Sequence, residues 1–389
     1  MNKFNSIFGQ ILQVFDKRDF YQAVRETRAE RSAKGFSCWE QFVAMLFCQM
    51  GQAQSLREIC GGLATCLGKL RHLGVETAPR RSTLAYANEH RPWQLYQKVF
   101  FHLLGRCQDA AALQKRKFRF RNKLYSMDST LIELCASLFD WARYIQTKGA
   151  VKLHVLLDHD GYLPVFATVT EGNVHDVNIA HGLKFPKGSI IAMDAGYVDY
   201  AMFSRWTEQG VFFVTRQKGN AVYRVVEERE APQNSNVVKD QVIEFTGYQA
   251  KKDCPHRLRR VEVRDEENDR TIVILTNHLK FGATTVSAIY KDRWQIEIFF
   301  KAIKQNLKIK TFVGTSKNAL LVQIWTALIA VLLLKYLKLK SSLNWSLSNL
   351  IAMLRYNLFT YRDLWLWLND PFGTPAIVPQ EEQLMLSFR

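Results

Sequence analysis

The spacing of apolar residues divides the chain into a helical first third and a longer region where strands and helices alternate. In Trp39–Met50, apolar side chains recur every three to four residues, which is the period of a helix with one buried face. Ser55 followed by Glu58 forms a capping-box pattern at the start of another helix. We therefore expect a helical domain over residues 1–115.

From residue 116 the pattern changes to short apolar runs typical of strands. Three runs follow one another, and two more are each preceded by a candidate helix. The five runs are Leu124–Ile132, Val151–Leu157, Leu163–Val169, Ser189–Ala195 and Val211–Arg216. This is the strand order of the ribonuclease-H-like fold. We therefore expect an α/β fold with a ribonuclease-H-like core over residues 116–216 and 285–340.

Residues 217–284 interrupt this core with alternating apolar and polar positions, which predicts a β-rich insertion. Helical periodicity returns at about Thr285, and residues 341–389 are expected to form a C-terminal helical region. Ala319–Leu337 is the most apolar segment and has two interpretations, a membrane span or a buried core helix. Its charge-free run ends at Lys335, at the short end of the ~17–25 residues that a span needs, so the core helix is favoured.

The net charge points to a polyanionic partner. The 389-residue chain is 48% apolar, as ordinary globular proteins are, but its formal charge is +17. Residues 1–127 carry 21 basic and 9 acidic side chains, and basic residues crowd the segment Lys115–Lys123. Such a surplus indicates nucleic acid or an anionic membrane surface. We expect the helical domain to bind DNA; a small helical bundle without that function is the alternative.

The cysteines and the N-terminus indicate the compartment. The seven cysteines are scattered and none forms a C-x-x-C pair, which argues against a zinc ribbon or a redox motif. Such a set fits a reducing cytosol, and the first residues lack the apolar run of a signal peptide. The prediction is a cytoplasmic protein without a membrane anchor.

Two aspartates stand in apolar strands, where a carboxylate costs free energy unless it is paired or binds a metal. Asp128 lies within Leu124–Ile132, and Asp194 ends an apolar run directly before Ala195 and Gly196. In α/β sheets, functional groups gather at the carboxyl ends of strands. One such aspartate is more often a turn or capping residue, and two in this setting are more informative than one.

A third acidic residue lies among cations on one predicted helix. At 100° per residue, five polar side chains fall within a stripe of about 80°: Tyr290, Arg293, Glu297, Lys301 and Lys304. The opposite face is apolar. An amphipathic helix with ion pairs four residues apart would give the same stripe. It would not explain Trp294 on the polar face, because an exposed indole beside cations suits the stacking of a nucleobase.

The spacing Y-(2)-R-(3)-E-(6)-K, formed by Tyr290, Arg293, Glu297 and Lys304, resembles the signature of bacterial insertion-sequence transposases of the insertion-sequence-four type. In that family the glutamate completes an Asp-Asp-Glu (DDE) triad. The resemblance therefore implies that Asp128, Asp194 and Glu297 are catalytic and hold two Mg²⁺ or Mn²⁺ ions. Three further stretches look like the family: Lys152-Leu153-His154, Glu171–Asp176 and Phe213–Arg216.

The resemblance also implies what the protein does. A DDE transposase binds the terminal inverted repeats of its element as double-stranded DNA, cleaves them, and transfers the 3′ ends to target DNA by cut and paste. It would act as a homodimer on DNA, in the bacterial cytoplasm at the nucleoid. Tyr290, Arg293 and Lys304 would contact phosphates at the DNA end, and Trp294, Lys301 and Arg216 are further DNA-binding candidates, although Arg216 could equally lie in a solvated loop. His154, His175 and Asp176 are weaker site candidates, because a single histidine is more often a structural residue.

Two other functions stay open from the sequence. A nuclease of the same fold without strand transfer would carry the same carboxylates, but it needs less grip on the DNA end than Tyr290, Arg293 and Lys304 suggest. An inactive DNA-binding descendant of a transposase is the second, and the intact triad argues against it.

Overall fold

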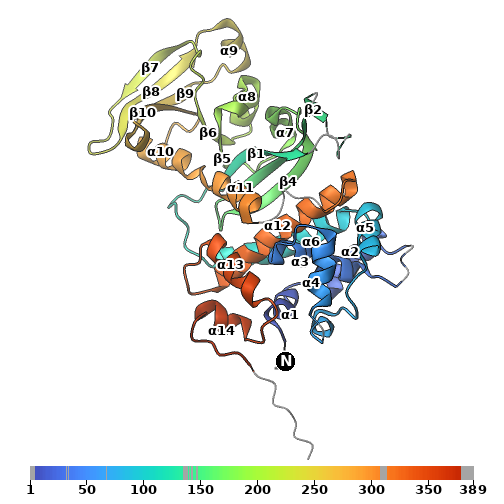
Figure 1. Ribbon diagram of the computed structural model, residues 1–389. Coiled ribbons are helices and arrows are strands. Elements are labelled where there is room, and N and C mark those ends of the chain that lie inside the picture. Colours follow the sequence, from blue (N-terminus) through green and yellow to red (C-terminus); the bar gives the residue numbers. More distant parts are fainter. Residues whose placement is uncertain are drawn as a thin grey trace, which may run out of the picture. The chain divides into compact units, whose positions relative to one another are not determined.

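The structure is a computed structural model that describes residues 5–31, 33, 35–66, 68–134, 139, 141, 143–145, 148–306 and 313–377. The chain folds into two compact units (Figure 1). The first combines Met1–Ala110 with Ala302–Arg389, and the second is Ala111–Lys301. Helices from the two ends of the chain thus share one core. The assignment of functions to residues 1–115, 116–216 with 285–340, 217–284 and 341–389 stays a prediction.

The first unit is helical. Its helices are α1 (Ile7–Leu12), α2 (Lys17–Thr27), α3 (Cys38–Gly51), α4 (Leu56–Ala64), α5 (Arg81–His90), α6 (Gln94–Ala112), α12 (Lys317–Lys340), α13 (Leu347–Asn357) and α14 (Leu364–Asn369). Serine or aspartate caps the start of most of these helices, and Ser37 and Glu40 form a full capping box on α3. Ser55 caps α4 as the sequence predicts, by accepting from the Glu58 N–H.

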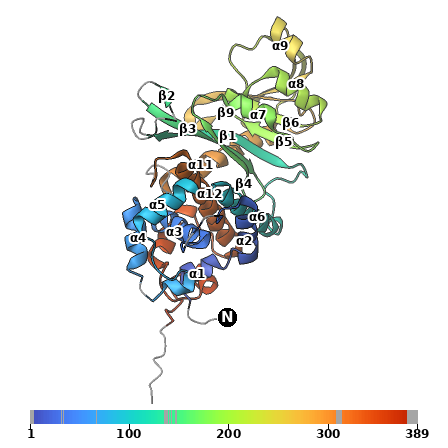
Figure 2. The same ribbon diagram turned by 90° about the vertical axis from the view of Figure 1, so that its right-hand side faces the viewer.

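The apolar segment of the sequence forms α12, which runs among α3 and α5 (Figure 2). Asn318 ties its start to the neighbouring helices by donating to the carbonyls of Asn88 and Arg91, at 2.8 and 2.7 Å. Within the described residues, α12 alone is long and apolar enough to cross a membrane, yet 83% of its most apolar window is buried inside the structure. Burial among helices accounts for its composition without a bilayer.

The second unit is built on a large mixed sheet. Its strands are β1 (Leu124–Leu134), β2 (Arg143–Ile145), β3 (Lys148–Asp158), β4 (Leu163–Glu171), β5 (Ile190–Met193), β6 (Phe212–Arg216), β7 (Tyr223–Arg229), β8 (Val237–Phe245), β9 (Leu258–Asp265) and β10 (Arg270–Thr276). They lie in the order β2-β3-β1-β5-β6-β10-β9-β8-β7, with β4 on β3. β1, β3 and β4 pair antiparallel, whereas β1, β5 and β6 pair parallel. The α/β class expected from the sequence is confirmed.

Alternating side chains of β5 fill two cores, one on each face of the sheet. Ile191 and Met193 pack in a core with α7 (Asp176–Gly182) and α8 (Tyr200–Glu208). Ile190 and Ala192 pack in the opposite core with α10 (Ala283–Asp292). This two-sided burial explains why the β5 sequence is apolar throughout rather than alternating.

Two features differ from the sequence-based expectation. Residues 217–284 do contain strands, but β10 pairs with β6, so these strands continue the same sheet. The predicted helix through Tyr290 and Lys304 is not continuous: α10 ends at Asp292 and α11 spans Gln295–Asn306. At the junction the hydrogen bonds tighten to three-residue spacing, from the Trp294 N–H to the Lys291 carbonyl and from the Glu297 N–H to the Trp294 carbonyl.

Candidate active site

The two aspartates lie at neighbouring positions of parallel strands. Met127 of β1 is opposite Met193 of β5, so Asp128 and Asp194 each follow a paired residue. The Asp128 side chain is 22% exposed, and Asp194 is exposed directly after its strand ends. β1 continues to Leu134 while β5 ends at Met193, so the two carboxylates come from adjacent strands at the point where the pairing of β1 with β5 ends.

Arg293 links Asp128 to Glu297 of α11. Its Nη2 donates to Glu297 Oε1 at 2.8 Å, and its Nη1 lies 3.6 Å from Asp128 Oδ2. The guanidinium is only 11% exposed, and its Nε has no hydrogen-bond partner in the described part of the chain. One cation is therefore shared between two carboxylates and is incompletely satisfied.

The surroundings of Asp128 favour its protonated form. Burial raises the pKa of its carboxyl to about 6, and the negative charges of Glu297 and Asp194 add to the effect. The Ser129 N–H, which donates to Asp128 Oδ1 at 2.8 Å, and the Arg293 guanidinium only partly oppose this rise. The three carboxylates thus act on one another electrostatically, and a further cation would relieve their repulsion.

The donor set fits a hard divalent cation in chemistry and charge. Carboxylate oxygens are the protein ligands that Mg²⁺ prefers. Across the described ranges, no three His, Cys, Asp or Glu side chains already stand close enough together to ligate a metal. Arg293 instead bridges two of the three carboxylates. Binding a cation there would require the guanidinium to release Asp128.

The remaining candidates for DNA contact differ in their exposure. The Tyr290 ring is half-buried beside the Arg293 guanidinium, 5.6 Å from the ring centroid, and burial raises the pKa of its hydroxyl. Trp294 is 57% exposed, as the polar-face position predicts. Lys301 on α11 and Arg216 at the end of β6 are also exposed. Lys304, half-buried on α11, lies beyond the second unit's boundary at Lys301.

A second polar cluster lies beside Asp128. The Asp176 carboxylate accepts from Ser129 Oγ at 2.7 Å and pairs with Lys152 Nζ at 3.1 Å. His154 Nδ1 is 3.6 Å from the same carboxylate. Burial lowers the pKa of His154 to about 4, so its ring is neutral at physiological pH. His154 and Asp176 are thus brought together, whereas His175 is exposed at the N-cap of α7.

The structure adds residues that the sequence analysis missed. Asp292, next to Arg293, is 3% exposed and contacts His159 and Tyr162. A signal for Asp292 was present in the sequence, because at 100° per residue it lies about 200° from Tyr290, on the apolar face. A carboxylate on an apolar helix face requires partners. His159 sits in a polar turn and carries no such signal.

Comparison with known proteins decides the family. Residues 120–333, more than half of the chain, match a family model described as "Transposase DDE domain". The chain belongs to the DDE transposase family. It is therefore an enzyme of the kind that recombines DNA, and this family generally uses divalent metal ions. Residues 3–76 match a second model, described as "Domain of unknown function (DUF4372)".

Curated relatives of this chain are also named as transposases. The protein y4zB of Sinorhizobium fredii, named as a transposase, is 34% identical over 72% of this chain and 77% of its own length. A protein of Geobacillus stearothermophilus, named as a transposase for insertion sequence element IS5377, is 28% identical over 71% of this chain and 72% of its own length. The chain is also similar to a solved piggyBac transposase synaptic complex with hairpin DNA, with a TM-score of 0.44, 10% identity, and coverage of 91% of this chain and 79% of that chain.

Proposed function

We propose that this transposase cleaves the terminal inverted repeats of its own insertion sequence and joins the 3′ ends to target DNA. The active residues would be Asp128, Asp194 and Glu297, holding two Mg²⁺ or Mn²⁺ ions. The observation that carries the proposal is the position of Asp128 and Asp194 on adjacent parallel strands, with Arg293 contacting both Asp128 and Glu297. Burial also raises the pKa of Asp128 to about 6. Groups with such shifted pKa values concentrate at functional sites.

The sheet supports a ribonuclease-H-like core. An antiparallel set, β4-β3-β1, is followed by the parallel neighbours β5 and β6, which is the order inferred from the sequence. This order accounts for Asp128 and Asp194 on adjacent strands. Glu297 then comes from a helix after the strands β7 to β10, as the insertion-sequence-four type implies.

Each side chain has a distinct proposed role. Bound divalent ions supply activation of the attacking oxygen and stabilisation of the leaving oxygen. Arg293 exchanges its long contact with Asp128 for a phosphate oxygen of the cleaved strand, since a guanidinium suits bidentate phosphate binding. Lys304 adds a point charge and Tyr290 a hydroxyl donor. The exposed Trp294 stacks on a base near the cleaved end.

DNA-end recognition is assigned to residues 1–115. Arg80 and Arg81 are exposed at the start of α5, which is separated from α4 by a connection that includes the 3₁₀ helix Leu70–Leu73. The excess of basic residues in this region, rather than a tight helix-turn-helix, supports the assignment. Binding through such residues weakens steeply as salt rises, because counterions are released from the DNA. The protein would work as a homodimer that holds two ends, in the bacterial cytoplasm at the nucleoid.

Incubation with DNA that carries the element's terminal repeats tests the proposal. With Mg²⁺ we expect end cleavage followed by joining to a second DNA, with Ca²⁺ binding but little cleavage, and with chelator no cleavage. Cleavage without any joined product would favour the nuclease. Binding without cleavage under every metal would favour an inactive descendant and would contradict the proposed function.

A further inference from the structure

The carboxylate of Asp292 is the centre of a buried network next to Arg293. Its side chain is 1% exposed and accepts from Lys117 Nζ at 2.5 Å, from His159 Nδ1 at 2.7 Å and from the Tyr162 hydroxyl at 3.1 Å. Burial alone would raise the pKa of Asp292, but the hydrogen bonds from His159 and Lys117 outweigh it and lower the pKa. Asp292 is therefore an ionised anchor at the end of α10.

His159 connects this anchor to β1. Its ring is 5% exposed, with Nδ1 facing Asp292 and Nε2 2.7 Å from Ser126 Oγ. The tautomer with hydrogen on Nδ1 satisfies both contacts, donating to Asp292 and accepting from Ser126. Ser126 precedes Asp128 by two residues and so lies on the same face of the strand. The three side chains join the strand of Asp128 to the residue before Arg293.

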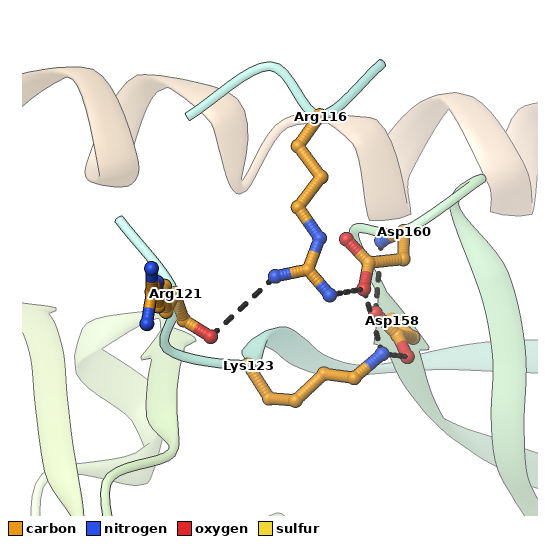
Figure 3. A network of polar contacts seen from close by, with 5 residues as sticks. All are labelled: Arg116, Arg121, Lys123, Asp158 and Asp160. Atoms are coloured by element: carbon orange, nitrogen blue, oxygen red, sulfur yellow. Dashed lines mark hydrogen bonds and ion pairs between the residues drawn. The ribbon is translucent and has the colours of Figure 1, made fainter. Parts of the chain in front are cut away.

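The turn that carries His159 is itself fixed on both sides (Figure 3). Lys123 Nζ lies 3.0 Å from Asp158 Oδ2 and 2.7 Å from Asp160 Oδ2. Arg116 Nη2 donates to Asp160 Oδ2 at 2.9 Å. Two cations from the basic segment thus clamp the acidic residues that flank His159, so the imidazole projects from a backbone with few alternative positions.

Serine, histidine and aspartate in this order also occur in hydrolases, where the serine oxygen attacks the substrate. Ser126 has no exposed surface, because it lies within β1 between neighbouring strands. No substrate reaches its oxygen. The burial of all three side chains assigns the network to positioning rather than to a second hydrolytic activity.

We propose that His159 is a positioning residue that fixes the end of α10, and with it Arg293 and Glu297, against the strand of Asp128. The inference rests on the proposed function of that carboxylate group. Between α10 and α11 the chain has two non-helical residues, Arg293 and Trp294, so the placement of Glu297 depends on what holds Asp292. A misplacement of about 1 Å at a reacting centre costs roughly a hundredfold in rate.

Two substitutions of His159 separate positioning from simple packing. The amide of Asn places its nitrogen near the position of Nδ1, whereas that of Gln reaches the position of Nε2. The backbone N–H of His159 already donates to the Leu124 carbonyl at 3.0 Å, so His159→Asn keeps the connection from β1 to Asp292. His159→Gln loses it. His256→Gln, in a half-buried histidine that contacts Ser204 and Glu208, is the matched control.

The experiment measures kcat and KM for end cleavage with Mg²⁺, using full-length protein at a temperature where melting curves show every variant folded. We expect His159→Gln to lower kcat about tenfold to a hundredfold with KM within about twofold of wild type. His159→Asn and His256→Gln should stay within about threefold of wild-type kcat. Ser126→Ala, which frees the ring without removing it, should lose about threefold to tenfold.

The outcomes separate this inference from the proposed function. Wild-type protein that fails to cleave would count against the proposed function itself. With active wild type and inactive Glu297→Gln, a normal kcat for His159→Gln would overturn the positioning role. Equal losses in His159→Gln and His159→Asn would also overturn it, because the conservative variant would then give no rescue. If His159→Gln does not fold, the kcat of Ser126→Ala decides in the same way.

Discussion

The sheet unit contains two aspartate–arginine pairs that are built differently. Asp240 on β8 and Arg259 on β9 form two parallel contacts, Nε to Oδ1 at 2.7 Å and Nη2 to Oδ2 at 2.5 Å, and both side chains are 4% exposed. Asp128 and Arg293 share one contact of 3.6 Å, and the same guanidinium also serves Glu297. We call Asp240–Arg259 the closed pair, because both carboxylate oxygens accept a hydrogen bond from the guanidinium. In the Asp128–Arg293 pair, the guanidinium Nε has no hydrogen-bond partner among the described residues.

The difference is the one that we expect between a structural ion pair and a pair in the proposed active site. The bidentate geometry of Asp240–Arg259 satisfies both charges where water is absent, and Arg259 also donates to the Phe281 carbonyl. Asp128 instead has a pKa raised to about 6, which means that folding alone does not stabilise its charge. A carboxylate kept in that condition is expected where a ligand completes the site.

The largest expected effect is on chemistry. Asp128→Asn, Asp194→Asn and Glu297→Gln each remove a charge that holds a divalent ion worth several kcal/mol to the transition state, so cleavage should fall by about a thousandfold or more. End affinity should stay near wild type. Single-turnover cleavage and gel-shift titration of the same variants measure both. Near-normal cleavage by Glu297→Gln would mean that the polar stripe containing Glu297, Lys301 and Lys304 is only the solvated face of an amphipathic helix.

Breaking the closed pair should affect stability instead. Asp240→Asn leaves Arg259 buried without its counter-charge, which should cost about 3–5 kcal/mol of the free energy of unfolding. Urea unfolding followed by circular dichroism measures the loss, and cleavage per folded molecule should not change. A loss below about 1 kcal/mol would mean that the Asp240–Arg259 pair contributes no more to stability than a solvent-exposed ion pair does.

Asp128→Asn, in contrast to Asp240→Asn, should increase the free energy of unfolding. The pKa of Asp128 is about 6 in the fold against an ordinary value of 3.8, so its ionisation opposes folding at pH values above both. Removing that charge should stabilise the metal-free protein by roughly 2–3 kcal/mol near pH 7.5. The gain should vanish below about pH 4, where the carboxyl is protonated in both states. A lower free energy of unfolding for Asp128→Asn near pH 7.5 would contradict the claim that the charge of Asp128 opposes folding.

Removing one cation should reduce cleavage less than removing one of the carboxylates. Arg293→Ala and Lys304→Ala each delete a charge-assisted contact worth about 1.5–3 kcal/mol, so cleavage should slow about tenfold to a hundredfold. Arg293→Ala should also bind Mn²⁺ at least as tightly as wild type, because no guanidinium competes for Asp128. Titration calorimetry measures that affinity, and weaker Mn²⁺ binding would show that Arg293 supports the metal site rather than competing with it.

The sequence was enough to predict candidate site residues that stand out from their immediate neighbours in the chain. A carboxylate inside an apolar strand or on a cationic helix face is visible from the order of residues, so Asp128 and Glu297 are predictable without knowledge of the fold. The break after Asp292 was not visible, because the segment contains no Gly or Pro and its bend depends on tertiary contacts. The pairing of β10 with β6 joins segments about sixty residues apart, which periodicity does not encode.

Polar contacts between residues that are far apart in the chain could not be predicted either. Asp292 could have been noticed as a carboxylate on an apolar helix face, but its partner His159 lies 133 positions away in the chain. Only the fold brings the two together. The division of Arg293 between Asp128 and Glu297 likewise depends on how α11 follows the junction. The sequence therefore predicts which residues belong to the proposed site, but not how their side chains are paired.

Metal-directed cleavage of the polypeptide tests the central claim most directly. Fe²⁺ in place of Mg²⁺, with peroxide and ascorbate, generates radicals that cut the backbone beside the bound ion, and mass spectrometry locates the cuts. We expect cuts next to Asp128, Asp194 and Glu297, suppressed by excess Mg²⁺, absent from Glu297→Gln and unchanged in Asp240→Asn. Cuts that cluster elsewhere, or that persist in Glu297→Gln, would contradict the assignment of these three carboxylates as the metal-binding group.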